Sequence, residues 1–164
     1  MLTQLKKLIR PKAFDLETTD QNYAKLTVEP LERGYGTTMG NAMRRILLSS
    51  IPGSAVCGIR AEGALHEFTT LPDVVEDMAT IILNVKGINL NCQNEEEHIL
   101  RIDIEGPKRV TAADITPMSG VTILNPNQYI ATVNENGRLS LELYTSSGLG
   151  YVLAEENKDR KSVV

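Results

Sequence analysis

The sequence contains no tryptophan, and aromatic residues make up only 4% of its 164 positions. A packed core must therefore consist mainly of isoleucine, leucine, valine and methionine. Hydrophobic residues account for 41% of the chain and charged residues for 23%. These proportions are typical of a folded protein and argue against extensive disorder.

The sequence also lacks an excess of positive charge. Its net charge is −4 and its isoelectric point is near 5.3. Proteins that read nucleic acid directly usually carry a basic face, because neutralisation of phosphates supplies most of their affinity. The charge balance therefore argues against a chain that is itself the main reader of DNA or RNA.

Cysteine and histidine are scarce, with two residues of each. Cys57 and Cys92 lie in apolar runs, which favours reduced thiols in the core over a disulfide framework, a redox pair or metal ligands. His66 and His98 lack the helical spacing of zinc ligands, and His66 next to Glu67 is typical of a surface or turn pair. We therefore expect neither a metal site nor another cofactor.

Membrane segments and catalytic motifs are missing as well. No apolar run reaches the roughly 18 residues of a spanning helix, and the basic N-terminus has no apolar core of a secretory signal. Gly34 and Gly36 lack the surroundings of a nucleotide-binding loop, and no serine-nucleophile elbow is present. The sequence predicts a soluble cytoplasmic protein, and no constellation of residues supports an independent small enzyme.

Hydrophobic periodicity predicts two helices. The first covers residues 37–49, and the second lies near residues 72–86, where Asp73 opens it and Gly87 closes it in a left-handed conformation. The apolar stripe of the first helix consists of Met39, Ala42, Met43, Ile46 and Leu47.

Alternation of apolar and polar residues predicts strands at residues 22–29 and 55–62. Two hairpins are expected farther along the chain, and the charged tail at residues 154–160 is expected to be weakly structured. In one hairpin Ile88, Leu90 and Cys92 pair with Leu100, Ile102 and Ile104, and in the other residues 129–133 pair with residues 139–144. This order of elements predicts the α+β class, with a domain boundary near residues 51–53.

The first predicted helix has a second face. At about 100° per residue, Asn41, Arg44, Arg45 and Leu48 lie opposite the apolar stripe. Isolated exposed leucines are common in soluble proteins and need no function. Arginine beside an apolar anchor is, however, also enriched in protein interfaces. The periodicity leaves both interpretations open, and Leu83 of the second helix presents a weaker version of the same pattern.

The run of residues 26–50, LTVEPLERGYGTTMGNAMRRILLSS, resembles the signature of the bacterial RNA polymerase alpha subunit family. Later segments resemble the same family in the same order. They are LHEF at residues 65–68, VED at 75–77 with LNVKG at 83–87, and VTAADI at 110–115. The resemblance extends from about Pro11 to Ala154, and the long first motif is highly specific.

The resemblance implies a discontinuous dimerisation domain with an inserted antiparallel β-rich domain. Residues 1–52 would form the first segment of the dimerisation domain, and residues 53–164 would form the inserted domain with one helix near 72–86. In the family the chain then completes the dimerisation domain and continues into a DNA-binding domain. We expect these parts to be absent after Val164, through truncation of the gene product or of the sequence.

The resemblance also implies partners. In the family a dimer of alpha subunits is the platform on which the two large catalytic subunits assemble, so this chain would be a non-catalytic subunit of a nucleotidyltransferase. Its expected partners are a second alpha subunit and the two large subunits; it would meet DNA only through the assembled enzyme and would not contact membranes. Expected large-subunit contacts are Arg44, Arg45, Leu48 and Lys86, and the expected dimer interface is Tyr35, Met39, Met43, Ile46 and Leu47.

One departure from the family pattern concerns position 149. The family's Gly-Arg-Gly-Tyr is Gly148-Leu149-Gly150-Tyr151 here, so a positive charge is lost. An alternative function also follows from the expected truncation. The chain could be a free-standing module that binds polymerase subunits without completing an enzyme, and co-purification with active polymerase would separate the two hypotheses.

Overall fold

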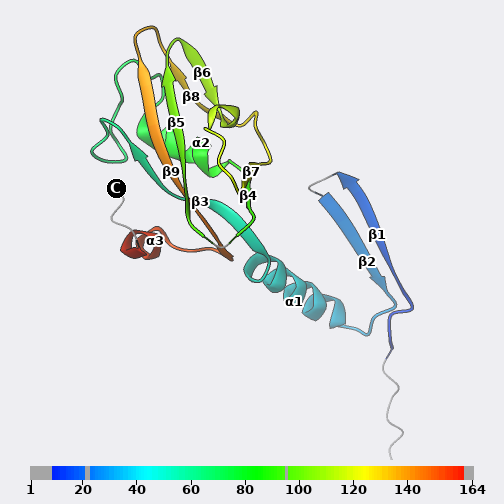
Figure 1. Ribbon diagram of the computed structural model, residues 1–164. Coiled ribbons are helices and arrows are strands. Elements are labelled where there is room, and N and C mark those ends of the chain that lie inside the picture. Colours follow the sequence, from blue (N-terminus) through cyan, green and yellow to red (C-terminus); the bar gives the residue numbers. More distant parts are fainter. Residues whose placement is uncertain (1–8, 21–22, 95, 161–164) are drawn as a thin grey trace, which may run out of the picture. The chain divides into compact units, whose positions relative to one another are not determined.

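The computed structural model describes residues 9–20, 23–94 and 96–160 (Figure 1). Helices and antiparallel strands are mixed along the chain, which confirms the predicted α+β class. In chain order the elements are β1 (Ala13–Asp20), β2 (Tyr23–Glu29), α1 (Tyr35–Ser49), β3 (Pro52–Ala61), α2 (Met78–Lys86), β4 (Leu90–Cys92), β5 (His98–Glu105), β6 (Lys108–Thr111), β7 (Val121–Ile123), β8 (Tyr129–Val133), β9 (Arg138–Leu149) and α3 (Ala154–Arg160), with a short 3-10 helix at Ala112–Asp114.

The chain divides into two compact units, Met1–Leu48 and Ser49–Val164. In the first unit β1 and β2 form an antiparallel hairpin in which Phe14 lies opposite Val28 and Leu16 opposite Leu26. These residues share one face, because side chains alternate between the faces of a strand. The assignment of this part of the chain to a dimerisation domain stays a prediction.

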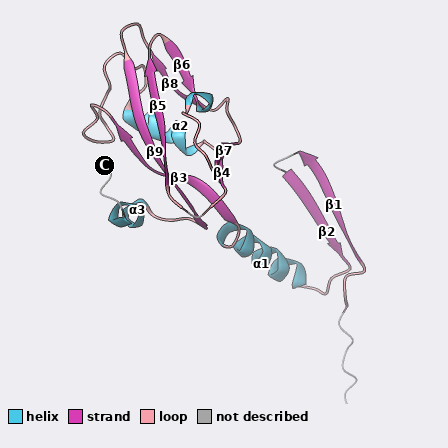
Figure 2. Cartoon of the chain, in the orientation of Figure 1, coloured by secondary structure: helices cyan, strands magenta, loops and turns pink. Residues whose placement is uncertain are grey.

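The second unit is built around a five-stranded sheet in the order β5-β9-β3-β4-β7, with β6 and β8 forming a separate pair (Figure 2). Helix α2 packs against β8 and β3. Strand β9 carries the alternating pattern of a half-buried strand, with Leu139, Leu141 and Leu143 facing inward. The core includes Leu and Ile side chains of β5, Leu side chains of β9, Ile81 of α2, and Val110, Ile130 and Val133 of the smaller sheet.

The second helix is shorter than predicted, since α2 begins at Met78 and not near residue 72. The preceding residues lie beside β8 instead: Val74 forms an antiparallel bridge with Val133, and the Val75 N–H donates to the Thr132 carbonyl at 3.0 Å. The predicted left-handed cap is also wrong, because Gly87 has φ −78°. A side chain there would approach Gln128 Nε2 to 2.7 Å, so close packing accounts for this glycine.

Both predicted hairpins are wrong in their pairing. Strand β4 has only three residues and pairs with β3 and β7, whereas β5 pairs along its whole length with β9. Strand β8 pairs with β6, although the turn at residues 134–137 forms as expected and leads directly into β9. Strand β9 has 12 residues, so β3 and β5 can each pair with it over more residues than with the strands next to them in the sequence.

Five elements were not predicted: β1, β6, β7, α3 and the short 3-10 helix at Ala112–Asp114. Strand β1 has a readable signal, because Phe14 and Leu16 alternate with Asp15 and Glu17. The tail at residues 154–160, predicted to be weakly structured, forms the short helix α3, with acidic residues Glu155 and Glu156 in its first turn. Acidic side chains stabilise a helix start through the helix dipole.

Candidate subunit-contact surfaces

Helix α1 has no buried residue within the chain. It starts just after Gly34, whose φ of +91° turns the chain into the helix and favours glycine at this position. The predicted stripe is exposed along its whole length, from 37% at Met39 to 58% at Ile46 and Leu47. Tyr35 and Met43 are exposed as well. A helix stripe of this kind is normally covered, so it is a candidate surface for association.

The second face of α1 is also open to solvent. Arg44 and Arg45 are exposed, and the exposed fraction of Leu48 is 62%. The structure brings these side chains onto one helical face, as the periodicity predicted. Whether they contact a partner stays a prediction.

Helix α2 combines a buried face with an exposed one. Met78, Ile81 and Val85 enter the core, whereas Leu83 is 67% exposed and Lys86 is exposed on the last turn. Lys86 also suits its position electrostatically, since a cation near a helix C-terminus is favoured by the helix dipole. We call the exposed residues Leu83 and Lys86 the α2 surface.

Both ends of α2 are held by side chains. At its start the Asp77 carboxylate accepts a hydrogen bond from the Thr80 N–H at 2.8 Å, and hydrogen bonding from Thr80 holds the pKa of Asp77 below its usual value. Near its end Asn84 Nδ2 donates to the Ile130 carbonyl at 2.9 Å. The α2 surface is therefore carried by a helix tied to β8.

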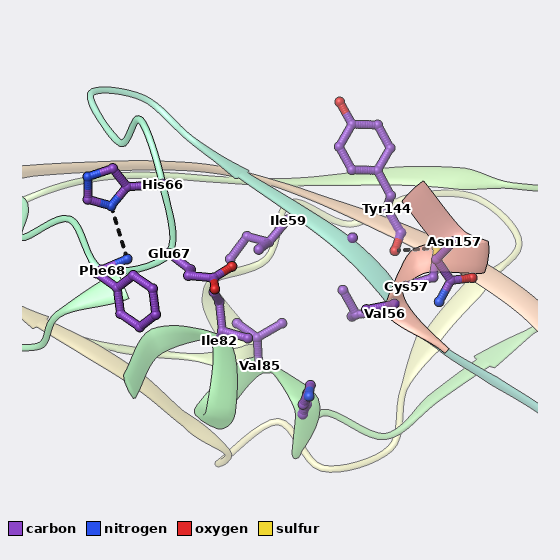
Figure 3. A pocket seen from close by; sticks show the side chains of 13 residues that line it. Val56, Cys57, Ile59, His66, Glu67, Phe68, Ile82, Val85, Tyr144 and Asn157 are labelled. Atoms are coloured by element: carbon purple, nitrogen blue, oxygen red, sulfur yellow. Dashed lines mark hydrogen bonds between the residues drawn. The ribbon is translucent and has the colours of Figure 1, made fainter. Parts of the chain in front are cut away.

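A pocket of about 570 Å³ lies beside α2 (Figure 3). Figure 3 shows Ile82 and Val85 on α2 directed toward Val56 and Ile59 on β3. The part of the pocket between α2 and β3 is therefore lined by apolar side chains. Lys86 adds a cationic group to the rim. The remaining lining residues are Cys57, Gly58, His66, Glu67, Phe68, Tyr144, Ala154 and Asn157.

Cys57 reaches the pocket because of an irregularity in β3. Val56 lies opposite Thr145 and Gly58 opposite Tyr144, so Cys57 is an extra residue in this strand. Such a bulge redirects a side chain. The thiol is half-buried and donates to the Tyr144 carbonyl at 3.3 Å. Cys92 is half-buried too, so neither cysteine is the fully buried core thiol that the sequence favoured.

The LHEF segment forms an exposed turn that contributes His66, Glu67 and Phe68 to the lining of the pocket. Leu65 is 83% and Phe68 74% exposed, and His66 Nδ1 accepts a hydrogen bond from the Phe68 N–H at 3.3 Å. This geometry fits the surface or turn pair predicted for His66 and Glu67. The motif was recognised in the sequence, but its two exposed apolar side chains were not assigned a role.

Among residues 9–20, 23–94 and 96–160, no group of three or more His, Cys, Asp or Glu side chains is arranged to hold a metal ion. None of the helices at residues 35–49, 78–86 and 154–160 is long and apolar enough to cross a membrane. His98 is buried, and its Nε2 lies 2.7 Å from Asn94 Oδ1.

Comparison with known proteins identifies close relatives. The family model described as "RNA polymerase Rpb3/RpoA insert domain" matches residues 58–163. The chain is 51% identical over 150 residues to the DNA-directed RNA polymerase subunit alpha of Alkaliphilus metalliredigens, covering 91% of this chain and 48% of that protein. It is 50% identical over 155 residues to the subunit of the same name from Carboxydothermus hydrogenoformans, covering 94% and 49%. The chain thus spans about half the length of these curated relatives.

Proposed function

Because the chain belongs to the bacterial RNA polymerase alpha subunit family and corresponds to its N-terminal region, we propose that it is an assembly subunit of a DNA-directed RNA polymerase. It recruits a second alpha subunit and the two large catalytic subunits, and it contributes no catalytic group of its own. Assembly takes place in the cytoplasm, and the chain meets DNA only through the completed enzyme. The observation that carries this proposal is the exposure of two distinct faces on α1, a helix with no buried residue.

The apolar stripe is proposed as the contact with the second alpha subunit. Tyr35, Met39, Met43, Ile46 and Leu47 lie along one side of α1 and are all exposed. Removal of such a stripe from water favours association by about 25 cal/mol for each Å² of apolar surface buried. A symmetric pairing of two such helices would bury the same stripe on both copies.

The arginine face of α1 and the α2 surface are proposed as contacts with the large subunits. Arg44 and Arg45 place positive charge beside the apolar side chain of Leu48. On α2, Lys86 places a positive charge at the apolar pocket. Interface hot spots often have this composition, in which an apolar side chain fills a pocket and arginine fixes the orientation. Residues 1–52 would then belong to the dimerisation domain and residues 53–164 to the inserted domain.

The test measures binding of the purified large subunits to variants of this chain. Arg45→Ala and Leu48→Ala are each expected to cost about 2 kcal/mol of binding free energy, with little change in melting temperature. Leu124→Ala is the matched control, since Leu124 is 61% exposed, close to the 62% of Leu48, and lies in the other unit. A lowered melting temperature with unchanged binding would contradict the proposal.

A further inference from the structure

The VED motif at residues 75–77 has a role in the proposed polymerase assembly that its sequence pattern alone does not indicate. We propose that Glu76 is a positioning residue for large-subunit binding: it ties the segment before α2 to β8 and so fixes the direction of Leu83 and Lys86. The inference rests on the proposed function. It assigns Glu76 no contact with a partner.

The Glu76 carboxylate is engaged at both of its oxygens by β8. Oε1 accepts a hydrogen bond from the Tyr129 hydroxyl, and Oε2 accepts one from the Thr132 N–H at 2.7 Å. The Tyr129 hydroxyl also lies 2.6 Å from Thr132 Oγ1, so the three side chains form one network. Hydrogen bonds to an ionised carboxylate are stronger than those between neutral groups, which makes this network a firm attachment.

The surroundings of Tyr129 hold its ring in place and keep its hydroxyl protonated. The Arg109 guanidinium carbon from β6 lies 4.9 Å from the centre of the Tyr129 ring, within the range of a cation–π contact. Burial and the hydrogen bond to Glu76 raise the pKa of Tyr129, so the phenol stays protonated and able to donate. The attachment of Glu76 thus extends through β8 to β6.

The backbone around Glu76 follows β8 as well. The Val75 N–H donates to the Thr132 carbonyl at 3.0 Å, and the Asn134 N–H donates to the Asp73 carbonyl at 2.8 Å. The next residue, Asp77, caps α2. Glu76 therefore sits at the junction between a segment held on β8 and the first turn of the helix.

The far end of α2 has its own attachment to the same strand. Asn84 Nδ2 donates to the Ile130 carbonyl, and Gln128 Nε2 donates to the Asn84 carbonyl at 3.1 Å. With Glu76 at the start and Asn84 near the end, side chains tie both ends of α2 to β8, while Met78, Ile81 and Val85 hold its inner face in the core. Loss of the Glu76 carboxylate leaves backbone contacts, such as the one from Val75 to Thr132, to hold the segment before the helix, so the start of α2 can shift and displace the α2 surface without unfolding the core.

Glutamate is suited to this role because the network needs two acceptors. Glutamine keeps the length of the side chain and one acceptor for the Thr132 N–H, but offers the Tyr129 oxygen a donor in place of the second acceptor. Alanine removes both acceptors and leaves the Thr132 N–H without this acceptor. The attachment of this segment to β8 is therefore expected to weaken stepwise as residue 76 is changed from glutamate to glutamine to alanine.

The first test follows the helix itself and needs no partner. Spin labels on Leu83→Cys and Leu124→Cys, in a background with Cys57→Ser and Cys92→Ser, report the distance between α2 and the loop after β7. Glu76→Ala is expected to broaden or shift this distance distribution, and Glu76→Gln to change it less. An unchanged distribution in Glu76→Ala would overturn the inference, whatever the large subunits do.

The second test is a double-mutant cycle for large-subunit binding. Lys86→Ala and Glu76→Ala are each expected to weaken binding on the order of tenfold, with a smaller loss from Glu76→Ala when Lys86 is already alanine. Asp103→Ala, which removes an exposed ion pair with Arg138 at 2.8 Å, is the control and should leave binding unchanged. Fully additive losses would overturn the inference. If the spin-label distances shift but Lys86→Ala binds normally, the proposed α2 contact fails while the positioning role of Glu76 stands.

Discussion

At the scale of single residues, Gly137 is explained by close packing against the backbone and not by an unusual φ angle. Gly137 does not have a positive φ, yet an added Cβ would lie 2.6 Å from the Asp73 carbonyl oxygen and 2.8 Å from Val133 Cγ1. Gly137 is the last residue of the turn that leads into β9, and Asp73 begins the segment that runs beside β8. The small residue therefore allows the attachment on which the positioning of α2 depends.

Gly137→Ala is expected to lower the free energy of unfolding by about 1–3 kcal/mol, because the backbone of the Asp73 segment must move aside. Gly148→Ala is the control, since a Cβ at Gly148 meets nothing within 4 Å. Urea denaturation of both variants measures the difference. Equal stability of the two variants would show that the Asp73 segment yields easily.

A second residue-scale prediction concerns Asp114. Burial alone would raise its pKa, but hydrogen bonds from Lys108, at 2.6 Å, and from the Thr111 N–H outweigh this and hold the pKa below 3.8. A carboxyl whose pKa is lowered by folding stabilises the protein above its unfolded pKa, and this contribution is lost as the pH falls through the folded value.

Asp114→Asn is therefore expected to be less stable than the unmodified chain at pH 7, by at most about 1 kcal/mol because Lys108 is partly exposed. The difference should shrink as the pH falls below about 4. Thermal unfolding from pH 7 to pH 2.5 measures it. A difference that stays constant over this range would contradict the assigned role of the charge.

At the scale of elements, α2 offers two large aliphatic residues with opposite roles. Ile81 is fully buried, whereas Leu83, two positions later, is 67% exposed. Ile81→Ala is expected to cost about 2–5 kcal/mol of stability, because it leaves a cavity in the core. Leu83→Ala should change stability by less than about 0.5 kcal/mol and weaken large-subunit binding instead.

Thermal unfolding and large-subunit binding, measured on the same two variants, separate these effects. The roles assigned here would be wrong if Leu83→Ala unfolded as readily as Ile81→Ala. They would also be wrong if Leu83→Ala bound the large subunits as well as the unmodified chain does.

Local periodicity was enough to predict α1, β2, β3 and the strand at residues 139–144 of β9, since each repeats its own apolar pattern over several turns or pleats. The α+β class followed from the order of these elements. The pairing of β4, β5 and β8 could not be predicted, because short strands give no register and their partners lie outside the predicted hairpins: β3 and β7 for β4, β9 for β5 and β6 for β8. The start of α2 was missed because contacts with β8 outweigh the helical pattern of residues 73–77.

The candidate contact residues on α1 were predictable as one helical face, because residues at helical spacing share a side of the helix. The pocket beside α2 was not predictable. It needs the bulge that turns Cys57, the position of the LHEF turn and the end of α2, which come from segments far apart in the sequence. The role of Glu76 was hidden for the same reason, because its partners Tyr129 and Thr132 are distant in sequence.

At the scale of the whole molecule, burial is distributed unequally between the two units. The core residues all belong to Ser49–Val164, whereas α1 has none. An exposed apolar stripe favours association. We expect weak, heterogeneous self-association that grows with protein concentration.

Sedimentation velocity at several concentrations measures this association. Ile46→Lys should reduce it, while Leu65→Lys, at an exposed position in the other unit, should not. Self-association that Ile46→Lys leaves unchanged, or that Leu65→Lys reduces equally, would contradict the prediction.

Hydrogen exchange of the backbone amides in Tyr35–Ser49 tests the central claim, that α1 is an assembly surface, most directly. The measurement compares the chain alone with the chain bound to the large subunits and uses strands β5 and β9 as internal references. We predict that α1 exchanges faster than both strands in the chain alone, because none of its residues is buried, and becomes strongly protected on binding while the strands change little. An α1 that is as protected as β9 before binding, or whose exchange does not slow in the complex, would contradict the account.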